Sequence, residues 1–291
     1  MGEPARRAQR REPELNVPAT LAPSPELLFA LDIDGTIVDH DGHLMPVVAR
    51  GIAAAQQRGA VVMLATGRGV GAVLPIAHML NMTSGYAVCS NGALVVELND
   101  SEAGFEVTDV ITFDPEPIIR RWLELVPGAL FMVDDAAGRT YATGVYPPGE
   151  LAVQPPVVSV DEICQITASR VTLRAPEMGA DELRAVVEES GMEGVNYAVG
   201  WTAWMDITPK DVSKGSALEM LRGRLQIARN ATVAVGDGAN DVEMLRWAHW
   251  SVAMGQARPE VQACADAVTN PVDEAGLAFV LSAVLTRKVR R

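Results

Sequence analysis

Four runs of apolar residues in this chain end in clusters of polar residues, and this feature constrains the fold most. The runs LLFALDID (27–34), AVVMLATGRG (60–69), YAVCSNGA (86–93) and ATVAVGDG (231–238) have the composition of buried strands. Helical patterns such as VVARGIAAAQQRG (47–59) separate them along the chain. Strands that are apolar on both faces and alternate with helices indicate a parallel sheet with helices on both sides. The sequence therefore predicts an α/β protein with a doubly wound parallel sheet.

The pattern changes in the middle of the chain, where the strands become shorter and more polar. Two helical stretches and turn-rich connections accompany them, which is typical of an α+β domain. We therefore predict a core made of residues 27–93 and 209–291, interrupted by an α+β insert at 94–208. The first 26 residues contain four arginines and no apolar segment after them, so we predict a disordered leader and not a secretory signal.

Composition excludes several classes of function. The net charge of -13 argues against nonspecific nucleic-acid binding, which needs a basic surface. The chain has no apolar run of about 18 residues, the length that predicts a membrane span. Three cysteines without a CxxC pair fit a reducing compartment, so we expect a cytoplasmic protein. No heptad pattern favours either a monomer or a dimer, and the oligomeric state stays open.

The polar residues at the strand ends are the candidate site. In a doubly wound sheet, ligands bind beyond the carboxyl ends of the strands. The residues at these ends are Asp32, Asp34, Thr66, Gly67, Arg68, Ser90, Asn91, Asp237, Asn240 and Asp241. Lys214 begins an amphipathic helix with Ser213 as its N-cap, which predicts a lysine near an exposed helix entrance. We expect these groups to form one site.

The chemistry of these residues points to a divalent metal beside a phosphate. Two carboxylates about 4 Å apart repel by roughly 4 kcal/mol at an effective dielectric of 20, so a crowded acidic site needs a cation. Oxygen ligands without histidine or thiolate suit magnesium, which binds through a few carboxylates together with a substrate phosphate. One carboxylate could then attack phosphorus while Lys214 stabilises the transferring group. Thr66 and the backbone N–H groups near Gly35 and Gly67 would bind phosphate oxygens.

Four segments together resemble a known family. DIDGT (32–36), LATGR (64–68), Lys214 in DVSKG and GDGANDVEML (236–245) are similar to the four motifs of the haloacid dehalogenase superfamily, specifically its Cof-type, class IIB phosphatases. The resemblance covers about residues 27–282. It implies a Rossmann-like core with an α+β cap domain, and the long interval between Thr66 and Lys214 is where such a cap fits.

The resemblance also implies roles for individual residues. Asp32 would be the nucleophile, Asp34 the acid and then the base, and Thr66 and Lys214 would hold the phosphoryl group. Magnesium would be bound by Asp32, the main-chain carbonyl of Asp34 and Asp237, with Asp241 in support. Asn240 would face the substrate or the lysine, and we predict substrate contacts for Gly67, Arg68, Asn91 and Asn240.

Several other polar residues have simpler interpretations. Asp39 and Asp41 in TIVDHDG are typical of a turn and are not predicted as ligands. Asp134 and Asp135 in FMVDDAAGRT indicate a hairpin or loop in the insert, which could overhang the site.

These observations predict a magnesium-dependent phosphatase of small phosphorylated metabolites, such as a sugar phosphate. Three alternatives stay open. One is a phosphomutase of the phosphomannomutase type, which has a similar cap and a DxDGT motif. Another is a metal-independent dehalogenase, which Asp34 and GDGAND argue against. The last is a non-catalytic protein that binds a phosphorylated ligand and regulates another process.

Overall fold

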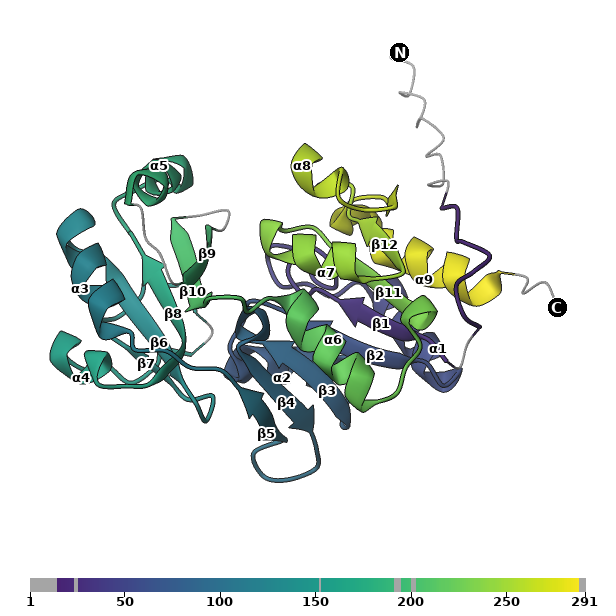
Figure 1. Cartoon of the computed structure of the whole chain (residues 1–291), viewed down its shortest axis with the longest axis horizontal. Helices are drawn as coiled ribbons and strands as arrows, with labels where there is room; N and C mark the ends of the chain where they lie inside the picture. The colour runs from purple at the N-terminus through teal and green to yellow at the C-terminus, as the bar shows by residue number, and fades with distance from the viewer. Residues whose placement is uncertain (1–14, 24–25, 152, 191–194, 200–202, 288–291) are drawn as a thin grey trace, which may run out of the picture.

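The computed structural model describes residues 15–23, 26–151, 153–190, 195–199 and 203–287. These residues form two sheets, each with its own helices and its own apolar core (Figure 1). The first sheet and its helices constitute the core domain, and the second forms a cap domain at its side.

The larger sheet has eight strands in the order β13-β12-β11-β1-β2-β3-β4-β5. Neighbouring strands pair in parallel, except that β4 pairs antiparallel with both β3 and β5. The strands are β1 (Leu28–Leu31), β2 (Val61–Ala65), β3 (Gly85–Cys89), β4 (Leu94–Leu98), β5 (Phe105–Val110), β11 (Thr232–Gly236), β12 (Trp250–Ala253) and β13 (Ala267–Val268). The strand order reverses at β1, as in a Rossmann-like sheet.

Helices cover both faces of this sheet, which confirms the predicted doubly wound fold. One face packs against α1, α2 and α9, and the other against α6, α7 and α8. Their bounds are α1 (Pro46–Gln57), α2 (Val70–Met79), α6 (Lys214–Arg224), α7 (Val242–Trp247), α8 (Pro259–Gln262) and α9 (Gly276–Thr286). Because both faces are buried, alternate residues of one strand enter different clusters: Phe29 joins one and Ala30 the other.

The cap domain is a five-stranded antiparallel sheet in the order β7-β6-β8-β10-β9, and the helices among its described residues pack on one face. Its elements are α3 (Glu116–Leu125), β6 (Leu130–Asp135), β7 (Thr140–Ala142), α4 (Val160–Cys164), β8 (Ala168–Arg174), α5 (Ala180–Ser190), β9 (Val195–Val199) and β10 (Trp204–Pro209). Val171 and Met205 pack under the helices. Side chains alternate along a strand, so Arg170 and Asp206 lie on the opposite face, toward the core domain.

The insert begins later than predicted. We expected the cap to start at residue 94, but β4 and β5 pair with β3 and extend the core sheet to residue 110. The second sheet starts with β6 at Leu130. The error has a physical cause, because β5 is a partly exposed antiparallel edge strand that mixes apolar and polar residues and lacks the continuous apolar run of the parallel core strands.

Part of the predicted disordered leader is ordered. Residues 1–14 and 24–25 lie outside the described residues, but Leu21 and Ala22 are buried in the core domain's larger cluster. The Ala22 N–H donates to the Asn230 carbonyl at 2.8 Å, and Arg287 donates to the Leu21 carbonyl at 2.9 Å. The apolar residues among the prolines of this segment give it a packing surface, which a judgement from overall composition missed.

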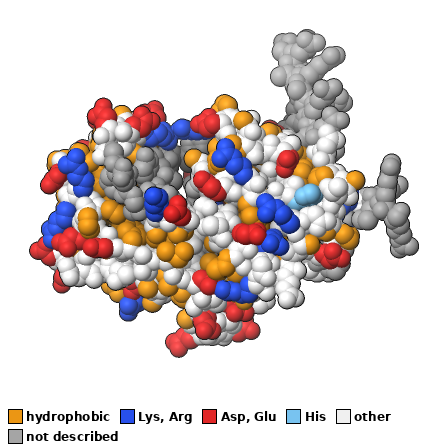
Figure 2. Space-filling model, viewed as in Figure 1, with side chains coloured by type: hydrophobic (Ala, Val, Ile, Leu, Met, Phe, Trp, Pro, Cys, Tyr) orange, Lys and Arg blue, Asp and Glu red, His pale blue; other side chains and the backbone are white. Residues whose placement is uncertain are grey.

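Acidic and basic side chains are interspersed over the viewed face of the molecule and do not gather into one basic area (Figure 2). The surface in this view therefore agrees with the net charge of -13 in offering no extended site for a polyanion. Within the described ranges, none of the helices has both the length and the hydropathy needed to cross a membrane.

Candidate active site

The carboxyl ends of β1 and β11 bring the predicted acidic residues together. These two strands pair in parallel, so Asp32 and Asp237, which directly follow them, emerge side by side. Asp241 lies in the short 3-10 helix 239–241, and its Oδ2 accepts from the Asp237 and Gly238 N–H groups at 2.9 and 2.8 Å. The three carboxylates are buried, and one oxygen of each lies within 4.8 Å of one oxygen of the other two.

Lys214 joins this acidic cluster from α6. Its Nζ donates to Asp32 Oδ1 and to Asp241 Oδ1, each at 2.6 Å. Ser213 caps the helix as expected, with a reciprocal bond to Ser216. The expectation of an exposed helix entrance was wrong, because Lys214 is 0% exposed. The helix starts against the core sheet, so its first residue points into the site.

The electrostatics of the cluster show an excess of negative charge. Burial and the neighbouring Asp241 raise the pKa of Asp32 well above its usual range, although Lys214 opposes them. The same two causes raise the pKa of Asp237 to about 6. Burial alone would lower the pKa of Lys214, but Asp241 and Asp32 raise it instead. The lysine therefore stays charged and compensates only part of the acidic cluster.

The donor set fits a divalent metal ion. When all three carboxylates are ionised, they and the one ammonium leave two negative charges in a buried site. A buried charge needs a partner, and a hard divalent cation supplies two positive charges to oxygen ligands. Asp32, Asp237 and Asp241 therefore fit the prediction of magnesium, while the role of the Asp34 main-chain carbonyl stays a prediction.

Asp34 and Arg68 form an ion pair beside the acidic cluster. Arg68 Nε and Nη2 donate to the two Asp34 oxygens at 2.9 and 2.6 Å. The Asp34 side chain is 53% exposed, unlike the buried Asp32. The Arg68 N–H donates to Thr66 Oγ1 at 3.1 Å, which ties the loop after β2 to this pair. Arg68 thus binds Asp34, the predicted general acid and base. Its contact with substrate stays a prediction.

The two predicted asparagines contact each other. Asn240 Nδ2 donates to Asn91 Oδ1 at 2.8 Å, which links the ends of β11 and β3. Asn91 lies in the turn after β3, where its backbone is left-handed (φ 54°). A Cβ on Gly67 would lie 3.2 Å from Asn91 Oδ1, so all three residues border the same small space. The structure therefore brings together the residues predicted at three separate strand ends.

Sequence reasoning missed Gln256. Its Nε2 donates to the Gly35 carbonyl at 2.6 Å and to Asp237 Oδ2 at 3.0 Å, and its Oε1 accepts from the Val272 N–H. The glutamine thus orients a predicted metal ligand. A signal existed, because Gln256 follows the apolar run WSVAMG just as the aspartates follow theirs.

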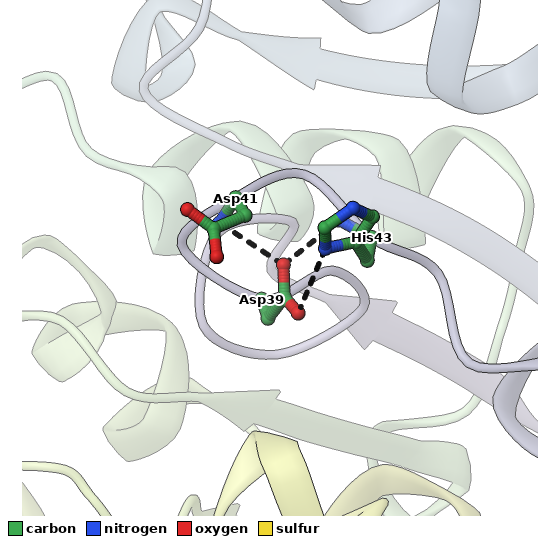
Figure 3. A group of neighbouring side chains, drawn as sticks. All are labelled: Asp39, Asp41 and His43. Atoms are coloured by element: carbon green, nitrogen blue, oxygen red, sulfur yellow. Dashed lines mark hydrogen bonds and ion pairs between the residues drawn. The ribbon is translucent and has the colours of Figure 1, made fainter.

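The turn at Asp39 is separate from this cluster. Asp39 Oδ1 accepts from the N–H groups of Asp41 and His43 at 3.0 and 2.8 Å, and Asp39 Oδ2 lies 3.4 Å from His43 Nδ1 (Figure 3). These local bonds are those of an Asx turn. The Asp39 carboxylate therefore shapes the loop, in agreement with the interpretation of Asp39 and Asp41 as turn residues.

Comparison with known proteins decides the family. The model of the haloacid dehalogenase-like hydrolases matches residues 29–120 and 154–281. The chain belongs to this family. The predicted membership is confirmed, and the chain is a hydrolase whose motif residues form the cluster described above.

Relatives and solved structures are similar to this protein over most of its chain. YkrA of Bacillus subtilis is 29% identical over 275 residues, which cover 87% of this chain and 96% of that protein. Pyridoxal phosphate phosphatase YbhA of Escherichia coli is 27% identical over 259 residues, covering 83% and 92%. The solved structure of a subclass IIB sugar phosphatase of the same superfamily superposes with a TM-score of 0.72 at 24% identity, covering 88% and 98%. This last similarity confirms the fold of core plus cap.

Proposed function

We propose that the protein is a magnesium-dependent phosphatase of small phosphorylated metabolites, such as sugar phosphates, that works through a phospho-Asp32 intermediate. The observation that carries the proposal is the bond of Lys214 to both Asp32 and Asp241 inside a buried acidic cluster. This arrangement holds one carboxylate at a fixed place where it can attack phosphorus. The phosphatase names of relatives such as YbhA support it, and the buried thiols of Cys89 and Cys164 agree with a cytoplasmic location.

In the first step Asp32 attacks the phosphorus atom. A bond forms between an Asp32 oxygen and phosphorus, the bond from phosphorus to the leaving oxygen breaks, and Asp34 gives that oxygen a proton. Lys214 and the Thr66 hydroxyl stabilise charge on the transferring group. Both Asp34 oxygens accept from Arg68 in the structure, so Arg68 must release one of them when substrate enters.

In the second step water hydrolyses the intermediate. Asp34 takes a proton from the water, the water oxygen attacks phosphorus, and the bond to Asp32 breaks to release inorganic phosphate. Asp32, Asp237 and Asp241 would hold magnesium, which when bound supplies positive charge beside the phosphoryl oxygens. The cap would exclude bulk water from this site and contact the leaving group.

The test is phosphate release from a panel of phosphomonoesters, with magnesium or with a chelator, for the native chain and Asp32→Asn. We expect magnesium-dependent turnover that is lost in Asp32→Asn, because an amide is not a nucleophile for phosphorus. An equally active Asp32→Asn variant would contradict the proposal.

The same panel separates the alternatives. A phosphomutase would require glucose 1,6-bisphosphate and would yield an isomeric phosphate instead of free phosphate. A dehalogenase would release halide from haloacids without magnesium. A binding protein would retain a phosphorylated ligand without turnover, and Asp32→Asn would not change its function.

A further inference from the structure

Arg170 of the cap reaches into the core domain. Its side chain is 9% exposed, and Nη1 donates to the Gly67 carbonyl oxygen at 2.6 Å. Nε and Nη2 lie 2.9 and 2.8 Å from Asp134 Oδ2, and the Thr140 hydroxyl donates to Asp134 Oδ1 at 2.7 Å. Asp134, near the end of β6, thus fixes two nitrogens of the guanidinium. The third, Nη1, contacts the core and also lies 3.3 Å from Asp206 Oδ1 of the cap.

The contact falls on one particular peptide group. The Gly67 carbonyl and the Arg68 N–H belong to the same planar peptide and point in opposite directions. While Arg170 binds the carbonyl, the N–H donates to Thr66 Oγ1 at 3.1 Å. The Thr66 oxygen accepts this bond, so its own hydroxyl proton is directed away from the N–H and is free to be donated to another acceptor. The orientation of this peptide therefore sets the orientation of the Thr66 hydroxyl.

We propose that Arg170 is a positioning residue for phosphoryl transfer, acting from the cap through the Gly67–Arg68 peptide on Thr66. Cap closure then has a second effect besides enclosing substrate, because it fixes the donor that Thr66 offers to a phosphoryl oxygen. The inference rests on the proposed function, since Thr66 matters in this way only where a phosphoryl group is bound.

Gly69 gives independent support for this docking. Its backbone is extended (φ -72°, ψ 161°), a conformation that alanine adopts without strain. A Cβ at this position would nevertheless lie 2.6 Å from Asp134 Oδ2 and 3.3 Å from Arg170 Nη2. The absence of a side chain at residue 69 is therefore what lets the Asp134–Arg170 pair sit against the loop after β2. Gly71, two residues on, has open space around the same position.

The experiment is a double-mutant cycle with p-nitrophenyl phosphate as substrate, using Arg170→Met, Thr66→Val and the double variant. We expect Arg170→Met to lower kcat by about 10- to 100-fold while KM changes by less than about threefold, because the lost contact acts in the transition state. In the Thr66→Val background, Arg170→Met should lower kcat by less than about twofold, because the hydroxyl that Arg170 positions is absent. Arg170→Lys should recover part of kcat.

Gly69→Ala and Gly71→Ala are the matched pair that keeps the test valid if Arg170→Met fails to fold. The first should lower kcat as Arg170→Met does, and the second should behave like the native chain. Additive effects of Arg170 and Thr66, or a fully active Gly69→Ala, would overturn this inference alone. Lack of turnover by the native chain would overturn the proposed function and this inference with it.

Discussion

At the scale of single residues, Gln256 tests the metal site without removing a carboxylate. Its amide holds Asp237 Oδ2 at 3.0 Å and the Gly35 carbonyl at 2.6 Å. We expect Gln256→Met to weaken magnesium affinity by about tenfold, because groups that orient a metal ligand contribute at this level. Calorimetric titration of magnesium into the folded protein measures it directly.

The control is Gln165→Met, since Gln165 is exposed on the cap. Its magnesium affinity should equal that of the native chain. If Gln256→Met also binds magnesium with native affinity, then Gln256 does not orient Asp237 for the ion.

How well single residues can be predicted depends on how they reach the site. Asp32 and Asp237 follow neighbouring parallel strands, so a rule about strand ends is enough to bring them together. Arg170 obeys no such rule, because its contact with Gly67 spans 103 positions and depends on how the cap docks on the core. The local sequence of an inserted domain does not show which face of its sheet will contact the other domain.

At the scale of elements, the start of α6 depends on a close approach by the turn after β3. Gly92 has φ +102°, and a Cβ there would lie 2.2 Å from the Ser213 carbonyl oxygen. We expect Gly92→Ala to destabilise the protein by about 2–4 kcal/mol, from the positive φ and from the overlap with the helix that carries Lys214. Urea unfolding of the metal-free protein measures the loss.

Gly85→Ala separates the two causes. Gly85 also has φ +102°, but its Cβ position is open, so it should show the backbone cost alone, about 1 kcal/mol. Equal losses in the two variants would mean that the approach to α6 does not matter for stability.

The elements that the sequence misassigned are those with mixed burial. The strands β1, β2 and β11 are buried almost throughout, and their continuous apolar runs predicted them without ambiguity. β5 has only half-buried and exposed residues at the sheet edge, and only its pairing with β4 assigns it to the core. Pairing is a long-range property, so the boundary at 94 could not be corrected from local pattern.

At the scale of the whole molecule, the acidic cluster couples stability to pH and magnesium. The pKa of Asp237 is raised to about 6 from an ordinary value of 3.8. A carboxyl with a raised pKa stabilises the fold below its ordinary pKa and loses this contribution as pH rises through the folded value. With magnesium removed by a chelator, we therefore expect Asp237 to lower the free energy of unfolding as pH rises from about 4 to about 6.

Magnesium should reverse that loss, because it favours the ionised carboxylates that burial disfavours. At a concentration about 100 times the Kd, it should stabilise the fold by about 2.7 kcal/mol. Urea unfolding from pH 4 to 8, with chelator or with magnesium, measures both effects. Asp237→Asn should reduce the pH dependence in chelator and remove most of the magnesium effect, while Asp100→Asn, at an exposed loop residue, should retain both. A magnesium effect that survives Asp237→Asn would place the ion elsewhere in the protein.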